Sequence, residues 1–74
     1  MKTINLKEYK HDGELINLDK EYNNYEKLLY NPSLYLDKKK KYYFYCKNGI
    51  KSKKVVNILE IYGYDVIRVI IKDD

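Results

Sequence analysis

Hydrophobic and polar positions follow several distinct patterns along this chain, and each pattern predicts one kind of element. Residues 3–6 (TINL) and 15–18 (LINL) are short β-like runs, and the polar segment between them contains Gly13 and is expected to form a loop. Residues 42–45 (YYFY) place four bulky side chains in a row, which is typical of a strand covered on both faces. Residues 65–71 (DVIRVII) predict a final buried strand.

The segment between the second and third predicted strands has the apolar spacing of a helix. Positions i, i+3, i+6 and i+7 are filled by Tyr22, Tyr25, Leu28 and Leu29. Asp19 is expected to cap the start of this helix, and the pair Asn31-Pro32 is expected to end it. A further short helical turn is expected at residues 33–37.

Helical spacing returns between the third and fourth predicted strands. The apolar face of this second helix consists of Val55, Ile58, Leu59 and Tyr62. Ser52 stands where an N-cap belongs, and Gly63 stands where a helix C-terminus belongs. Strands that alternate with helices imply crossover connections, so the sequence predicts an α/β fold with a small, mostly parallel four-stranded sheet and flanking helices. No linker or internal repeat interrupts residues 1–74, which we interpret as a single domain.

Composition adds limits to this picture. With 74 residues, of which 45% are hydrophobic, the fold depends mainly on one compact core. The chain lacks an apolar run of about eighteen residues, so we expect no membrane-spanning helix. Residues 1–10 are charged throughout, which does not resemble a signal peptide. A single cysteine and no secretion signal favour a reducing, cytoplasmic setting.

The charged residues leave two further hypotheses open. The net charge is +4, and residues 38–41 are four consecutive lysines. This run is either an anion or nucleic-acid patch or a solvated loop, and we favour the loop because a basic run without a groove or repeat is common. His11 has no second histidine and no cysteine placed to share a metal, so we expect it to pack within its loop. No metal or organic cofactor is expected.

Cys46 holds the only thiol, and it ends the third predicted strand. A lone cysteine in an apolar run is commonly a small core residue. Here the strand end is followed by Gly49 and by the start of a helix, and ligands of open α/β sheets bind at the carboxyl ends of strands. A tight loop and a helix N-terminus offer N–H groups to an anion. We therefore expect this position to favour a nucleophilic thiolate.

From Tyr42 onward the sequence resembles the active-site loop, the following helix and the last strand of rhodanese-like sulfurtransferases. The pattern of that family is a strand, then Cys-Arg-x-Gly-x-Arg followed by Ser or Thr, then an amphipathic helix that ends in Gly-Tyr or Gly-Phe. Three positions of this chain match outright, and they are Cys46, Gly49 and Ser52. Lys47 and Lys51 stand where arginines are common in the family.

The resemblance implies a sulfurtransferase or sulfur carrier of the short, single-domain bacterial type. Cys46 would take sulfane sulfur from a small anionic donor, thiosulfate or a persulfide, and pass it to cyanide, to a thiol or to a partner protein in a sulfur relay. The implied binding loop, whose N–H groups at residues 47–51 would hold the persulfide sulfur, consists of Lys47, Asn48, Gly49, Ile50, Lys51 and Ser52.

The spacing of the basic residue separates this chemistry from that of cysteine-type phosphatases. Those enzymes need an arginine at the sixth position after the cysteine, so that the loop is wide enough for phosphate. In this chain the sixth position is Ser52, and the basic residue Lys51 is the fifth. A lysine also lacks the planar, bidentate contact that arginine makes with phosphate. We therefore do not expect a phosphatase.

The chain departs from the family in ways that favour a second hypothesis. Residues 11–18 and 4–7 resemble the family only loosely, with Asn5 and Lys7 in place of an aspartate and an arginine. After the last strand, family members continue with Gly-Gly and a tryptophan-bearing helix, whereas this chain continues with residues 72–74 and has no tryptophan, so it resembles a family member truncated at the C-terminus. The alternative is a catalytically weak binding or regulatory module. A small basic nucleic-acid-binding protein is a third, less favoured hypothesis.

Overall fold

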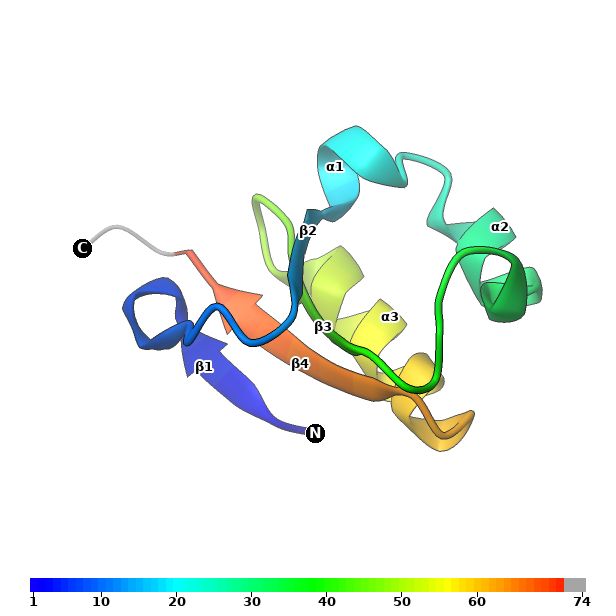
Figure 1. The fold of residues 1–74 in the computed structure, drawn as a ribbon. Coiled ribbons are helices and arrows are strands. Elements are labelled where there is room, and N and C mark those ends of the chain that lie inside the picture. The colour runs from blue at the N-terminus through cyan, green and yellow to red at the C-terminus, as the bar shows by residue number, and fades with distance from the viewer. Residues whose placement is uncertain (72–74) are drawn as a thin grey trace.

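The strands form one four-stranded sheet in the order β1-β4-β3-β2, and all three pairings are parallel (Figure 1). The computed structural model describes residues 1–71. Its strands are β1 (Thr3–Asn5), β2 (Glu14–Asn17), β3 (Lys41–Tyr45) and β4 (Asp65–Ile70). The mostly parallel, four-stranded α/β architecture that the sequence predicts is confirmed, with each strand within one residue of its predicted bounds. Residues 72–74, where the sequence departs from the rhodanese-like pattern, lie outside the described residues.

The prediction of one continuous helix that starts at a cap on Asp19 is wrong. Two short helices replace it, α1 (Leu18–Glu21) and α2 (Tyr25–Tyr30), and a 3-10 turn, η2 (Pro32–Leu34), replaces the predicted turn at residues 33–37. The Asn17 side chain accepts a hydrogen bond from the Asp19 N–H at 3.0 Å, so Asn17 and not Asp19 caps α1. The helix begins where β2 ends, because Asn17 is both the last residue of β2 and the N-cap of α1.

The second predicted helix is α3 (Ile50–Ile61), and it begins three residues earlier than a cap at Ser52 would place it. Its N-cap residue is Gly49, in the left-handed region with φ 77°, so the prediction that Ser52 caps the helix is wrong. Ser52 lies inside the first turn and is fully buried. The predicted end is confirmed, because Gly63 follows the last turn at φ 93° and donates its N–H to the Glu60 carbonyl.

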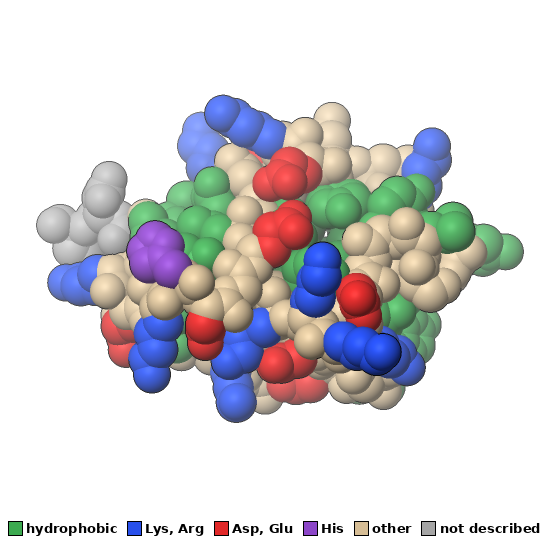
Figure 2. Space-filling view, viewed as in Figure 1, with side chains coloured by type: hydrophobic (Ala, Val, Ile, Leu, Met, Phe, Trp, Pro, Cys, Tyr) green, Lys and Arg blue, Asp and Glu red, His purple; other side chains and the backbone are tan. Residues whose placement is uncertain are grey.

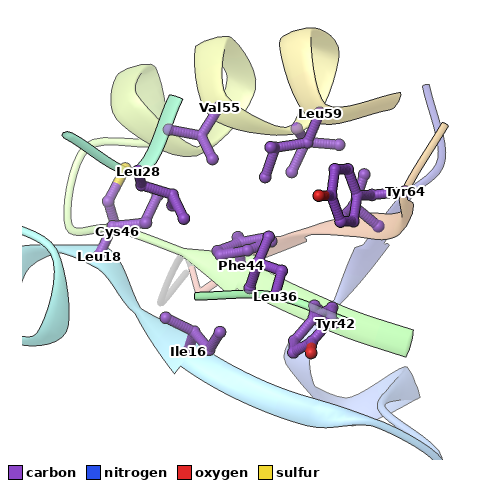
Figure 3. Packing of buried hydrophobic residues seen from close by; sticks show 12 residues of the cluster. Ile16, Leu18, Leu28, Leu36, Tyr42, Phe44, Cys46, Val55, Leu59 and Tyr64 are labelled. Atoms are coloured by element: carbon purple, nitrogen blue, oxygen red, sulfur yellow. The ribbon is translucent and has the colours of Figure 1, made fainter. Parts of the chain in front are cut away.

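Side chains from all three helices described, Leu18 of α1, Leu28 of α2 and Val55 of α3, join one buried cluster against the sheet (Figure 3). Alternate strand residues, such as Ile16, Phe44 and Val66, face this layer and meet Val55 and Leu59 from α3. Burying such side chains supplies the main free energy of folding in a domain of this size.

The opposite face of the sheet carries a smaller cluster, in which Tyr43, Ile67 and Val69 are buried. Tyr9, which follows the 3-10 turn η1 (Leu6–Glu8), packs edge-on against Tyr43 with ring centroids 4.7 Å apart. The prediction that residues 42–45 are covered on both faces is therefore confirmed, because Tyr42, Tyr43 and Phe44 are all buried. Among residues 1–71, no helix combines the length and the apolar character needed to cross a membrane.

Candidate active site

Cys46 follows the last residue of β3, at the carboxyl edge of the sheet where the sequence places it. Its side chain continues the alternation of Tyr42 and Phe44, so the sulfur is directed from the end of β3 toward the helix layer (Figure 3). Only 2% of the residue is exposed. The thiol is therefore part of the core cluster as well as of the loop, and it is more deeply enclosed than a thiol at an open loop mouth.

The Cys46 sulfur has three polar neighbours. The Ser52 N–H, in the first turn of α3, donates a hydrogen bond to Sγ at 3.3 Å. The Ser52 hydroxyl lies 3.6 Å from Sγ, and the Asn48 Oδ1 lies 3.7 Å from it. A neutral thiol donates its proton to one of these oxygens, whereas a thiolate receives the Ser52 N–H together with the reoriented Ser52 hydroxyl. In the structure the Ser52 N–H is the donor that reaches the sulfur, because the Ser52 hydroxyl donates to the Gly49 carbonyl at 3.2 Å.

The remaining loop amides do not all turn toward the sulfur. The Lys47 N–H donates to Asp19 Oδ2 at 2.8 Å, and the Ile50 N–H donates to Asn48 Oδ1 at 3.0 Å. The sequence predicts that the N–H groups of residues 47–51 hold the persulfide sulfur. Two of these five amides, those of Lys47 and Ile50, are instead bonded to side-chain oxygens. The amide that reaches the sulfur comes from Ser52, one residue beyond the predicted set.

Asp19 ties this loop to α1, a role that the sequence did not reveal. Its carboxylate accepts the Lys47 N–H and forms an ion pair with Lys51 Nζ at 3.1 Å. The Lys47 amide and, secondly, the Lys51 ammonium lower the pKa of Asp19 below its usual value. Lys51 therefore holds the loop against α1, while the Lys47 side chain is exposed.

Arg68 ties the loop to β4 and is the second residue that sequence reasoning missed. Its Nη2 donates to the Gly49 carbonyl at 3.1 Å. The Gly49 carbonyl also accepts the Ser52 hydroxyl at 3.2 Å, so one peptide oxygen joins the arginine, the helix and the neighbour of the sulfur. The one available signal in the sequence was a lone arginine inside the apolar run of residues 65–71.

A cavity of about 260 Å³ opens between the loop and the end of β4. Its lining residues are Cys46, Lys47, Asn48, Gly49, Arg68, Val69, Ile70 and Ile71. A larger groove of about 700 Å³ lies elsewhere, along α2 and η2, where Figure 2 shows hydrophobic side chains gathered at the surface. Tyr30 and Leu34 there are 92% and 72% exposed. Cys46 lines the smaller cavity and does not line this groove.

Two polar groups lie away from this site. The Tyr43 hydroxyl donates to the Asp12 carboxylate, which also pairs with Lys41 Nζ at 3.2 Å. That hydrogen bond raises the pKa of Tyr43 to about 12. His11 packs against the Tyr9 ring with centroids 4.4 Å apart, as its predicted role within the loop requires. Within residues 1–71, no three His, Cys, Asp or Glu side chains gather closely enough to hold a metal ion.

Comparisons of this chain with protein-family models, with curated proteins and with solved structures found no match. The likeness to rhodanese-like proteins therefore stays a resemblance of motif.

Proposed function

We propose that this chain is a rhodanese-like sulfurtransferase or sulfur carrier with Cys46 as its nucleophile. One observation carries the proposal: the sulfur stands at the end of a parallel strand and accepts an N–H bond from the first turn of the 12-residue helix α3. The N-terminus of a helix stabilises a negative charge, and the thiolate is the reactive form of cysteine. The Ser52 hydroxyl, 3.6 Å from the sulfur, donates to the Gly49 carbonyl when the thiol is protonated, and it becomes a second donor to the thiolate by turning from that carbonyl.

The first half of the cycle loads sulfur onto Cys46. The thiolate attacks the outer sulfur of thiosulfate and a new S–S bond forms, while the S–S bond of the donor breaks and its electron pair leaves with sulfite. With a persulfide donor, the leaving group is the thiolate of that donor. The product in both cases is a Cys46 persulfide whose negative charge rests on the terminal sulfur.

The second half of the cycle unloads that sulfur. Cyanide attacks the terminal sulfur and leaves as thiocyanate, or an acceptor thiolate attacks it and becomes a persulfide itself, and either reaction returns the Cys46 thiolate. The acceptor thiol belongs to a small molecule or to a partner protein in a sulfur relay. The cycle uses no metal and no organic cofactor. A reducing, cytoplasmic compartment keeps a single thiol available for it.

Loop movement is part of this proposal, because Cys46 is only 2% exposed. Cys46 lines the cavity together with residues 47–49, and this loop is held closed over the sulfur by the bonds of Asp19 to Lys47 and of Arg68 to Gly49. Breaking either bond lets the loop move away from α1 or from β4. The exposed Lys47 side chain attracts the anionic donor to this opening.

The same burial favours a second candidate, a rhodanese-like binding or regulatory module with weak chemistry. In that case Cys46 acts as a core residue that packs under α3, and its sulfur is never released to a donor. The two candidates differ in their response to Cys46→Ser. This variant abolishes sulfur transfer in the first and preserves the biological effect in the second.

A turnover assay with thiosulfate and cyanide tests the proposal. We expect the wild type to form thiocyanate and Cys46→Ala to form none. Ser52→Ala removes the hydroxyl that turns toward the thiolate and keeps the Ser52 N–H, and it is expected to lower kcat/KM by about tenfold, the equivalent of about 1.4 kcal/mol. Ser33→Ala is the matched control, because Ser33 is exposed and its hydroxyl bonds only to Asn31. Thiocyanate formation by Cys46→Ala at the wild-type rate would contradict the proposed nucleophile.

A further inference from the structure

Arg68 is the only arginine of the chain, and its guanidinium is incompletely bonded. The Nη2 donates to the Gly49 carbonyl, whereas the Nε–H is buried and has no hydrogen-bond partner within residues 1–71. Arg68 takes part in none of the ion pairs found in that range. Leaving a buried charged donor unpaired is costly, so this position favours a partner that the chain itself does not supply.

The position of Arg68 places this group on the same side of the sheet as the thiol. Arg68 on β4 is paired with Phe44 on β3, and Phe44 faces the helix layer. Cys46 lies two residues beyond Phe44 and shares that face, since side chains of a strand alternate. The arginine and the cysteine therefore belong to neighbouring strands, and both line the cavity of about 260 Å³.

The cavity has the size and charge for a small anion. Liquid water occupies about 30 Å³ per molecule, so this volume has room for an anion of several heavy atoms. Its lining includes Arg68 and Lys47 but no carboxylate from the described part of the chain. Arginine is the side chain whose planar fork matches two oxygens of one oxyanion.

We infer that Arg68 is the specificity-determining residue of an oxyanion subsite in this cavity, where it binds the sulfonate end of a thiosulfate-type donor. The inference deepens the proposed function, and only its consequence for sulfur transfer rests on that function. Gly49 holds Nη2 and so fixes the plane of the guanidinium, and the buried Nε–H becomes the donor to the anion when the loop moves as the proposed function requires. A donor held there occupies the cavity that the Cys46 loop lines, whereas a persulfide donor, which has no sulfonate oxygens, gains nothing from this subsite.

The test uses the Cys46→Ser variant, which binds a donor without reacting with it. Because the chain has one arginine, the Nε–H of Arg68 gives a single side-chain signal in ¹⁵N-resolved NMR spectra. We expect this signal to shift and saturate on addition of thiosulfate, and also of sulfate, at constant ionic strength. Chloride at the same ionic strength is expected to leave it in place. This readout needs no substitution at Arg68 and is independent of how such a variant folds.

Substitution of the arginine gives the second readout. Arg68→Lys keeps the charge and loses the fork, so the affinity for thiosulfate is expected to fall by at least about tenfold. Lys53→Gln is the control. Lys53 is exposed on α3 and does not line the cavity, so this substitution removes one positive charge outside the cavity. An unmoved Nε–H signal, or equal affinity in Arg68→Lys and the parent, would overturn the subsite.

A carboxylate from residues 73 or 74 is the other possible partner for Arg68, and the double variant Asp73→Asn, Asp74→Asn distinguishes it. We expect the Nε–H signal of this variant to match that of the parent before any anion is added. A large shift on substitution alone would assign the guanidinium to the chain itself and overturn the inference. Persulfide formation without a response of Arg68 defeats the subsite alone, and anion binding without persulfide formation defeats the proposed function alone.

Discussion

Gly49→Ala perturbs the contact that ties the Cys46 loop to β4. Gly49 has φ 77°, a conformation that costs a residue with a Cβ about 1–2 kcal/mol. A methyl group built there lies 2.9 Å from Nη2 of Arg68, so the guanidinium must move. Its hydrogen bond to the Gly49 carbonyl is then weakened, and a bond from a charged group contributes about 1.5–3 kcal/mol.

Together these effects predict a loss of about 3 kcal/mol in the free energy of unfolding. A domain of this size has only about 4–11 kcal/mol in total. The variant should fold, with a melting temperature lower by about 12–24 °C. Urea unfolding followed by tyrosine fluorescence measures the difference, since the chain has ten tyrosines and no tryptophan.

Gly63→Ala is the matched control for this prediction. Gly63 also has positive φ, at 93°, but the nearest atom to an added methyl group is the end of the flexible Lys38 side chain, 3.7 Å away. It should lose only the conformational part, about 1–2 kcal/mol. In an Arg68→Met background the excess cost of Gly49→Ala should disappear. Equal costs for the two alanine variants in the wild-type background would refute the contact between Gly49 and Arg68.

Two further predictions concern groups that the structure ties down. Asp19→Asn weakens the bonds to the Lys47 N–H and to the Lys51 ammonium, so the loop over Cys46 opens more often. Iodoacetamide should therefore label Cys46 several-fold faster than in the wild type. An unchanged labelling rate would contradict the role of Asp19. The Tyr43 phenol donates to Asp12, which raises its pKa to about 12 from an unfolded value of about 10. The resulting stabilisation is complete below about pH 10 and is lost as pH rises through about 12, so the free energy of unfolding should fall across this interval. Asp12→Asn should reduce that fall, and an identical pH dependence of urea unfolding in the two proteins would contradict the assignment.

The sequence predicted what depends on local patterns. Runs of bulky residues located the strands to within one residue, and the glycine after Tyr62 located the end of α3. The place of Cys46 at a strand end followed from the change of period between β3 and α3. These features need only neighbouring residues, and the parallel order of strands then follows from the alternation of strands and helices.

The sequence did not predict contacts between distant segments. Asp19 looked like a helix cap, yet its carboxylate holds a loop that is 28 residues further along the chain. Arg68 looked like one residue of a buried strand, yet it bonds to Gly49, 19 residues before it. The start of α3 was misplaced because Gly49 in a left-handed conformation begins a helix without a side-chain cap, which freed Ser52 to contact the sulfur.

Intact-mass spectrometry after incubation with thiosulfate tests the central claim most directly. The wild type should gain the mass of one sulfur atom, and cyanide should remove it again. Cys46→Ala should gain nothing under the same conditions, while Ser33→Ala should behave as the wild type does. A folded wild-type protein that gains no sulfur would contradict the persulfide mechanism and would favour the binding module.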